Sequence, residues 1–149
     1  MSVTLAGSCT RKFDPLKKRK DLFEVTGNED APIAIVAWGS VAGVCREALA
    51  MAKAEGINVK LLVPYLLYPV AEGAYLNFFA SVQKGLIIEQ SHLAQFHKLL
   101  RMHLELPKGV KSLARSGANP FLPGEIVVAL HHLLSELQRS HEGNLQPQE

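Results

Sequence analysis

Two short polar pairs follow apolar segments of the chain, and each pair could carry chemistry. Gly39-Ser40 comes straight after six apolar residues, where a strand would pass into a helix. A strand, a glycine and a helix start form an arrangement that binds phosphates through backbone N–H groups. The dinucleotide fingerprint G-x-G-x-x-G is missing, so the pattern favours an ordinary helix start with Ser40 as its N-cap.

The second pair, Glu89-Gln90, lies at the carboxyl end of another apolar segment. Sheets of α/β proteins usually place functional groups at this end of a strand. One carboxylate without a nearby partner is weak evidence for general acid–base catalysis. Capping of residues Ser91–Leu93 or a contact with another subunit explains the pair as well. Glu89 and Gln90 are therefore candidates for a ligand loop or an interface, and we assign no catalytic residue.

Histidine, serine and cysteine residues form no recognisable centre. His92, His97 and His103 lack the spacing that places two ligands on one helical face, so we expect no metal site. No serine stands in a G-x-S-x-G elbow. Cys9 and Cys45 occur in separate contexts, without a redox or zinc spacing between them. We expect neither a nucleophile nor a phosphate-cofactor site in this chain.

The candidate residues are positioned by a strand–helix–strand unit. Residues 33–38 are apolar without alternation, which is typical of a strand covered on both faces. Residues 41–55 carry an apolar stripe at helical spacing, and Gly56 suits the left-handed position after a helix. Residues 59–63 predict a second buried strand. The connection between the two strands should be right-handed.

The remaining segments continue this alternation. Weak alternation over residues 22–26 predicts an edge strand antiparallel to 59–63, and apolar runs at 86–88 and 110–113 predict two more strands. Further helices are expected over residues 70–81, 92–104 and 124–139. We expect the strand at 33–38 to lie between those at 59–63 and 86–88 in a parallel sheet. The fold class is therefore α/β.

Length and composition suit one domain. With 149 residues and 48% hydrophobic content the chain can form a substantial core, and its net charge of +2 favours no particular partner. We expect a basic arm or linker at residues 1–20, the α/β domain at 21–139 and a disordered tail at 140–149. The arm is basic from Arg11 to Lys20 but has no interleaved aromatic residue beyond Phe13, so we expect no nucleic acid. We also expect no membrane span, no signal peptide and a cytoplasmic location.

An apolar loop follows the strand at 59–63 and consists of Tyr65, Leu66, Leu67 and Tyr68. A contiguous apolar set of this size is unusual on the surface of a monomer. Aromatic residues beside polar groups are typical of interface cores. The loop therefore either faces a partner or packs beneath the helices of its own domain, and the sequence leaves both interpretations open.

Short motifs occur in a fixed order from about Phe23 to Leu130. They are IAIVAWGS at 33–40, Arg46-Glu47-Ala48, EGINVK at 55–60, Tyr68-Pro69, LIIEQ at 86–90, Gln95, Leu99-Leu100-Arg101, NPF at 119–121 and PGEI at 123–126. In this order they resemble the C-terminal, transketolase C-terminal-like domain (domain II) of the alpha subunits of 2-oxoacid:ferredoxin oxidoreductases. The resemblance is greatest to the 2-oxoglutarate type.

Two segments depart from the patterns of related proteins. The family often continues Glu-Gln with asparagine, an aromatic residue and Gly-Gln-Leu, whereas Ser91, His92, Ala94, Gln95 and Phe96 stand here. Related thiamine-dependent dehydrogenases usually carry a Leu-Arg-x-Leu-x-Pro segment. The corresponding residues 65–69 contain no arginine, which favours the ferredoxin-linked branch.

The resemblance implies a three-layer α/β/α fold with a five-stranded, mostly parallel sheet and an antiparallel edge strand. It also implies that catalysis lies elsewhere. Thiamine diphosphate and magnesium would be bound by other domains, and the iron–sulfur cluster by the complex. The partners would be a thiamine-binding domain, a beta subunit and, through the complex, ferredoxin. This chain would hold no cofactor and would supply contacts for oxidative decarboxylation of a 2-oxoacid to an acyl-coenzyme A. A free-standing α/β binding or interaction module, and a homo-oligomer, remain alternatives.

Overall fold

A computed structural model describes residues 14–144 of the chain and contains one five-stranded sheet. The strands lie in the order β1–β3–β2–β4–β5. They are β1 (Phe23–Gly27), β2 (Ile33–Ala37), β3 (Val59–Pro64), β4 (Lys84–Glu89) and β5 (Val110–Ala114). β1 is antiparallel to β3 and the other pairs are parallel. The central position of β2, the antiparallel edge strand and the mostly parallel sheet are confirmed.

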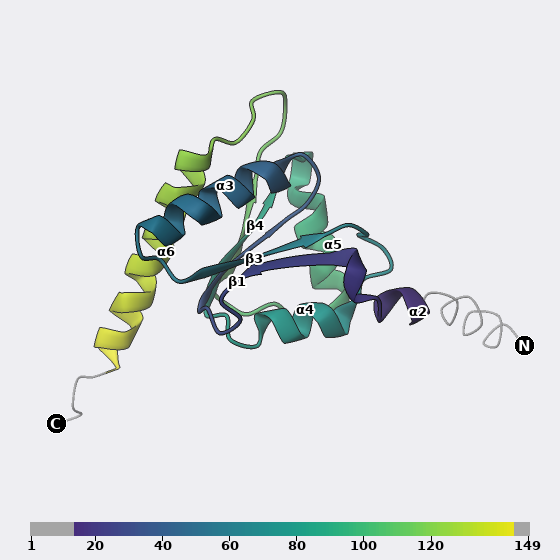
Figure 1. The fold of residues 1–149 in the computed structure, drawn as a ribbon, viewed down its shortest axis with the longest axis horizontal. Helices are drawn as coiled ribbons and strands as arrows, with labels where there is room; N and C mark the ends of the chain where they lie inside the picture. Colours follow the sequence, from purple (N-terminus) through teal and green to yellow (C-terminus); the bar gives the residue numbers. More distant parts are fainter. Residues whose placement is uncertain (1–13, 145–149) are drawn as a thin grey trace, which may run out of the picture.

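Helices cover both faces of the sheet (Figure 1). The two on one face are α3 (Val41–Ala54) and α6 (Pro123–Gly143), and the two on the other are α4 (Glu72–Phe79) and α5 (Gln95–His103). Shorter helical turns are α2 (Asp14–Lys17), η1 (Lys20–Leu22) and η2 (His92–Ala94). The molecule is therefore a three-layer α/β/α sandwich, as the resemblance implied.

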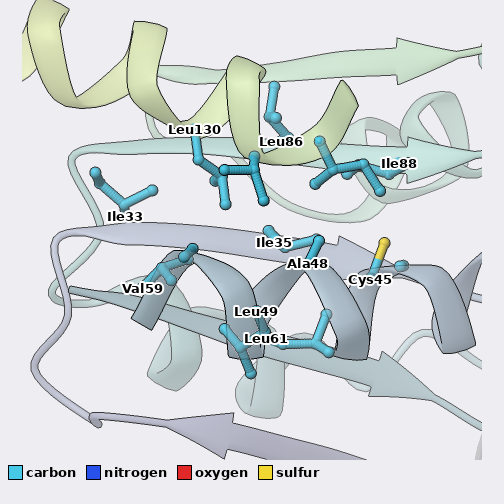
Figure 2. Close-up of a cluster of buried hydrophobic side chains, with 14 of the residues drawn as sticks. Ile33, Ile35, Cys45, Ala48, Leu49, Val59, Leu61, Leu86, Ile88 and Leu130 are labelled. Carbon is cyan, nitrogen blue, oxygen red and sulfur yellow. The ribbon is translucent and has the colours of Figure 1, made fainter. Parts of the chain in front are cut away.

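The central strand explains why the apolar pattern of the sequence does not alternate. All five residues of β2 are buried, since successive side chains point to opposite faces and helices cover both. Figure 2 shows Ile33 and Ile35 from β2 together with Leu61, Ala48 and Leu130 in the cluster beneath α3 and α6. Ala34 and Val36 belong to the second cluster, beneath α4 and α5. Each fully buried large aliphatic side chain stabilises the fold by about 1.5–3 kcal/mol.

Two predicted helices on the α4 and α5 face are shorter than expected. The helix expected over 70–81 spans Glu72–Phe79, and Ala71 before it makes no side-chain cap. The helix expected over 92–104 is regular only from Gln95, because Leu93 and Ala94 have φ values of 69° and 51°. Positive φ values are incompatible with a continuous right-handed helix.

The strand expected over residues 33–38 ends one residue earlier than predicted, so Trp38 lies just outside β2.

The end of the predicted domain is wrong by four residues. α6 continues past Arg139 to Gly143, so residues 140–143 are helical and do not belong to a disordered tail. No proline or glycine interrupts the helix before Gly143, and Ser140 Oγ donates to the carbonyl oxygen of Glu136 at 2.9 Å. Asn144 follows as the C-cap, and residues 145–149 of the predicted tail lie outside the described residues.

The expected basic arm is described from Asp14 onward. Here α2 contacts α4, and Lys17 Nζ lies 3.8 Å from Glu72 Oε1. Part of the arm therefore packs on the domain. The part with Cys9, Arg11 and Lys12 lies outside the described residues.

Candidate functional site

The candidate residues from the sequence gather along the carboxyl edge of the parallel strands. Because β2, β3 and β4 are parallel, the segments that leave their carboxyl ends start at the same edge of the sheet. Gly39-Ser40 follows β2, the segment Tyr65–Tyr68 follows β3, and Glu89-Gln90 ends β4. We call this region the carboxyl edge.

At the first of these positions the chain turns into α3. Gly39 has a φ of +67°, which a glycine adopts without strain, and its carbonyl accepts a hydrogen bond from the Ala42 N–H at 3.2 Å. Ser40 is exposed and already has helical backbone angles, with φ −62° and ψ −25°. An N-cap side chain requires an extended backbone, and Ser40 makes no such bond. Ser40 therefore occupies the N-cap position of α3, as predicted, but the expected hydrogen bond from a backbone N–H to its hydroxyl is not formed.

Glu89 is fully buried and holds the start of α5. Its carboxylate accepts hydrogen bonds from the backbone N–H groups of Phe96 and His97, both at 2.9 Å, and from the Ser91 hydroxyl. Ala94, at the N-cap position, has no side-chain acceptor to offer. Glu89 supplies that acceptor from β4, and a carboxylate at a helix N-terminus also complements the helix dipole. Glu89 therefore acts as a capping residue, but the backbone N–H groups that it caps are those of Phe96 and His97 and not those of residues Ser91–Leu93, because the regular helix begins only at Gln95.

Gln90 forms hydrogen bonds that connect the end of β4 to the segment between β5 and α6. Its Nε2 donates to the carbonyl oxygens of Gly117 at 3.0 Å and Asn119 at 3.1 Å. Both acceptors belong to the segment that connects β5 to α6. The amide thus fixes the position of that segment along the carboxyl edge.

Tyr65 joins three elements through a hydrogen-bonded network with Glu24 and Arg46. Its hydroxyl donates to Glu24 Oε2 at 2.7 Å, while Arg46 Nε and Nη2 donate to the same carboxylate at 2.8 and 2.7 Å. Glu24 lies on β1 and Arg46 on α3. The bonds from Arg46, and then that from Tyr65, lower the pKa of Glu24 to about 2. The Glu24–Arg46 pair was not foreseen from the sequence, which indicated only that Arg46 faces outward.

The apolar loop after β3 is divided between surface and core. The side chains of Tyr65 and Tyr68 are 60% and 58% exposed, whereas Leu66 is partly buried and Leu67 packs against the core cluster beneath α4 and α5. The Tyr68 ring contacts His103 edge to face, with 6.2 Å between ring centroids. Leu67 therefore packs beneath the helices of its own domain, while the two tyrosines are exposed and their contact with a partner stays a prediction.

Two further apolar residues are exposed beside the loops of this edge. Leu93 is 62% exposed after β4, and Leu122 is 59% exposed immediately before α6. Leu93 has helical spacing to Phe96 and Leu100, which are buried, so a regular helix over residues 92–104 would have buried it too. Its left-handed backbone turns Leu93 outward. A bulky residue in this conformation is uncommon and is often found at functional sites.

The remaining polar groups offer little chemistry. The Cys45 thiol is fully buried, and burial raises its pKa to about 12. Among residues 14–144, no group of three or more His, Cys, Asp or Glu side chains could hold a metal ion. The carboxylate of Glu89 is occupied by three donors. The described residues therefore do not fit a magnesium-bound diphosphate. No helix within the same range combines the length and apolar character needed to cross a bilayer.

Sequence comparison finds relatives among oxidoreductase subunits, although no protein-family model matches the chain. The alpha subunit of 2-oxoacid:ferredoxin oxidoreductase 2 from Aeropyrum pernix is 28% identical over 127 residues, which cover 83% of this chain and 20% of that subunit. Ketoisovalerate oxidoreductase subunit VorB from Methanothermobacter thermautotrophicus is 40% identical over 58 residues, 39% of this chain and 16% of that subunit. The chain thus spans about a fifth or less of the curated relatives it matches.

Solved structures give the same result. The 2-oxoglutarate:ferredoxin oxidoreductase of Magnetococcus marinus matches with a TM-score of 0.73 and 31% identity, over 80% of this chain and 20% of that one. A split-gene transketolase matches with a TM-score of 0.58 and 17% identity, over 76% of this chain and 41% of that one, which supports the fold. The homologues and structural neighbours of this chain are thus 2-oxoacid:ferredoxin oxidoreductases and their alpha subunits, and its fold is transketolase C-terminal-like.

Proposed function

We propose that this chain is an assembly domain of a 2-oxoacid:ferredoxin oxidoreductase alpha subunit. The observation that carries the proposal is the match of four fifths of the chain to about a fifth of such proteins, in sequence and in fold. The whole enzyme would decarboxylate a 2-oxoacid oxidatively, form an acyl-coenzyme A and reduce ferredoxin. We assign the chemistry to domains outside this chain.

The state of the polar groups at the carboxyl edge supports a role without catalysis. Glu89 caps α5 and Gln90 fastens the segment between β5 and α6, so both side chains serve the fold of the domain itself. A general acid or base must have an oxygen available to the substrate. We therefore expect thiamine diphosphate, magnesium and the iron–sulfur cluster of the complex to be bound by partner domains.

The exposed apolar residues of the same edge support a contact surface. Tyr65, Tyr68, Leu93 and Leu122 each expose more than half of their side chains. Their loops are held by Gln90 and by the Glu24–Arg46–Tyr65 network, so the surface is largely formed before any partner binds. Aromatic and aliphatic anchors on a rigid support are typical of interface centres. We expect the thiamine-binding domain and the beta subunit to pack on this edge.

We further propose 2-oxoglutarate as the substrate of the whole enzyme and the cytoplasm as its location. The support is the M. marinus protein, which is named as a 2-oxoglutarate:ferredoxin oxidoreductase and is 31% identical to this chain over 80% of the chain's length. The two curated relatives are named for 2-oxoacids in general and for ketoisovalerate, so substrate preference needs its own measurement.

Co-purification tests the proposal. The 149-residue chain, with an affinity tag, is expressed together with the thiamine-binding domains and beta subunit from the same genome. We expect a stoichiometric complex in size-exclusion chromatography with light scattering, and methyl viologen reduction that depends on 2-oxoglutarate and coenzyme A. Elution of the chain as a separate species, with full activity in the remaining subunits, would overturn the assembly role. Activity with another 2-oxoacid alone would overturn the substrate assignment.

A pair of matched variants locates the contact. Tyr68→Ser with Leu93→Ser removes two anchors of the carboxyl edge. Leu76→Ser with Val128→Ser removes two similarly exposed apolar residues from α4 and α6. We expect the first pair to weaken association at least tenfold and the second to leave it unchanged. Equal effects of the two pairs would contradict an interface at this edge.

A further inference from the structure

A hollow of about 740 Å³ lies away from the carboxyl edge, on the face of the sheet that α4 and α5 cover. Its walls are β1, β3, α4 and the basic segment 17–20. In Figure 1, α2 lies at one end of β1, and α4 runs on the same side of the sheet. The volume is within the range of about 300–1,000 Å³ typical of small-molecule sites. We call this feature the β1–α4 hollow.

The long wall of the β1–α4 hollow is apolar, and no side chain of residues 14–144 covers it fully. Val25 on β1 lies opposite Leu62 on β3, and its side chain remains 56% exposed. Phe78 and Ala74 line the hollow from α4. Gly73, also in α4, has no atom within 4 Å of an added Cβ. A helix with a large residue in place of Gly73 would fill the space that α4 leaves open here.

Positive charge gathers at the end of the wall where β1 begins. Lys17, Lys18, Arg19 and Lys20 all line the hollow. Lys17 is paired with Glu72, and Arg19 with Asp21. Within residues 14–144, the ammonium groups of Lys18 and Lys20 have no ion-pair or hydrogen-bond partner, and both residues are exposed. Two cations are thus available to a ligand.

A further cation lies inside, at the opposite end of the wall. Lys60 faces Gly27 in the register of β1 and β3 and is only 2% exposed. Its ammonium donates to the Glu29 carbonyl oxygen at 2.8 Å and to Ser81 Oγ at 2.9 Å, and it lies 4.7 Å from the centre of the Phe78 ring. These acceptors carry no net charge, and burial lowers the pKa of Lys60. Of the acidic residues between 14 and 144, Glu29 is the one that lines the hollow.

We propose that the β1–α4 hollow binds a small amphiphilic anion. The apolar body of the ligand would lie along Val25, Leu62 and Phe78, and its carboxylate, phosphate or sulfate group would meet Lys18 and Lys20. The wall from Phe23 to Gly27 is about 13 Å long, because a strand rises about 3.3 Å per residue. An extended nucleic acid would require a longer basic surface with stacking faces. The inference is independent of the assembly role at the carboxyl edge.

Competition binding to the full chain tests the chemistry. The fluorescent probe is 1-anilinonaphthalene-8-sulfonate. Its displacement is measured with dodecyl phosphate, dodecanoate, dodecyltrimethylammonium, inorganic phosphate and a leucine–glutamate peptide. The three dodecyl compounds are kept below their critical micelle concentrations. We expect displacement by one or both dodecyl anions at concentrations at least tenfold below that of the cation, and none by phosphate alone. The ratio between the two anions identifies the preferred head group. Equal displacement by the cation, or displacement by the peptide only, would overturn the proposal.

Amide chemical-shift mapping on the unaltered chain locates the site. We expect dodecyl phosphate to shift the amides of Val25, Gly27, Ala74 and Asn77. Shifts confined to the carboxyl edge would place the ligand elsewhere and overturn the proposal. This measurement needs no substitution, so it remains decisive if a variant fails to fold.

Two matched variants complete the test. Gly73→Leu places a side chain in the hollow, whereas Gly43→Leu places one at an exposed position of α3 where an added Cβ also has no atom within 4 Å. We expect at least a tenfold loss of affinity for the first and none for the second. Lys18→Gln with Lys20→Gln should weaken anion binding more than Lys98→Gln with Lys108→Gln. Unchanged affinity in Gly73→Leu, with native circular dichroism, would contradict binding in the hollow.

Discussion

At the residue scale, the Glu89 carboxylate stabilises the carboxyl edge by accepting three hydrogen bonds at the start of α5. Substitution Glu89→Ala would leave the buried N–H of Phe96, the N–H of His97 and the Ser91 hydroxyl without their acceptor. We expect a loss of about 2–3 kcal/mol in the free energy of unfolding. Glu89→Gln keeps one acceptor oxygen and should lose less. Urea denaturation of both variants measures the difference, and an Ala variant as stable as the wild type would contradict the capping role.

Tyr75 presents the opposite case of a polar atom without a partner. Its hydroxyl is buried and has no hydrogen-bond partner among the described residues, while its ring packs edge to face on Phe23. A buried hydroxyl without a partner costs free energy, so Tyr75→Phe should raise the free energy of unfolding by up to about 1 kcal/mol. Thermal unfolding provides the measurement. A clear loss of stability would instead reveal a bound water or a partner of the hydroxyl.

At the scale of elements, Glu24 connects the edge strand β1 to α3 and to the loop after β3. Hydrogen bonds from Arg46 and Tyr65 lower the pKa of Glu24 from an ordinary value near 4.5 to about 2. Because the folded-state pKa is the lower one, the carboxylate stabilises the fold fully above about pH 4.5, and this contribution is lost as the pH falls toward 2. We expect Glu24→Gln to flatten the dependence of stability on pH in this window. The midpoints of urea unfolding, measured between pH 2 and 6, test this prediction. The variant Glu142→Gln, at an exposed position, is the control for the exchange of a glutamate for a glutamine.

The covered strands could be predicted from the sequence because their apolar runs do not alternate. Residues 33–38 and 59–63 do not alternate, which requires covering layers on both faces and therefore a central, parallel position. The boundary of α5 could not be predicted in this way. Leu93, Phe96 and Leu100 have helical spacing, but the backbone of Leu93 is left-handed, and the helix after it is capped from outside by Glu89, seven residues before Phe96 at the end of β4.

The candidate site was predictable in its location and not in its contacts. The ends of parallel strands place Ser40, Tyr65 and Glu89 at one edge whatever their neighbours are. Whether Tyr65 is exposed and where its hydroxyl donates depend on Glu24 and Arg46, which come from other elements. Lys60 stands within the apolar run 59–63, but its own burial was not predicted. Its acceptors, the Glu29 carbonyl and Ser81, are known only from the fold.

For the whole molecule, both core clusters are closed by the chain's own helices, so the domain should fold without its proposed partners. Ile35 and Ala37 pack beneath α3 and α6, and Ala34 and Val36 beneath α4 and α5, so β2 links both clusters. We expect the 149-residue chain to unfold in one cooperative transition by circular dichroism and fluorescence. Two separate transitions would show that the layers are stabilised independently.

Amide hydrogen exchange of the isolated chain gives a sharper prediction at this scale. β2 is hydrogen-bonded on both sides and all its residues are buried, so its amides should open only in global unfolding. β1 and β5 each pair on one side only and have largely exposed residues, so local opening should release their amides earlier. We expect protection to fall from β2 to β3 and β4 and then to the two edges, with exchange from β1 at least a hundredfold faster than from β2. In the assembled enzyme, the amides around Tyr68 and Leu93 should gain protection while those of β2 stay unchanged. Equal protection of β1 and β2 in the isolated chain would mean that the edge is covered there, by a second copy of the chain.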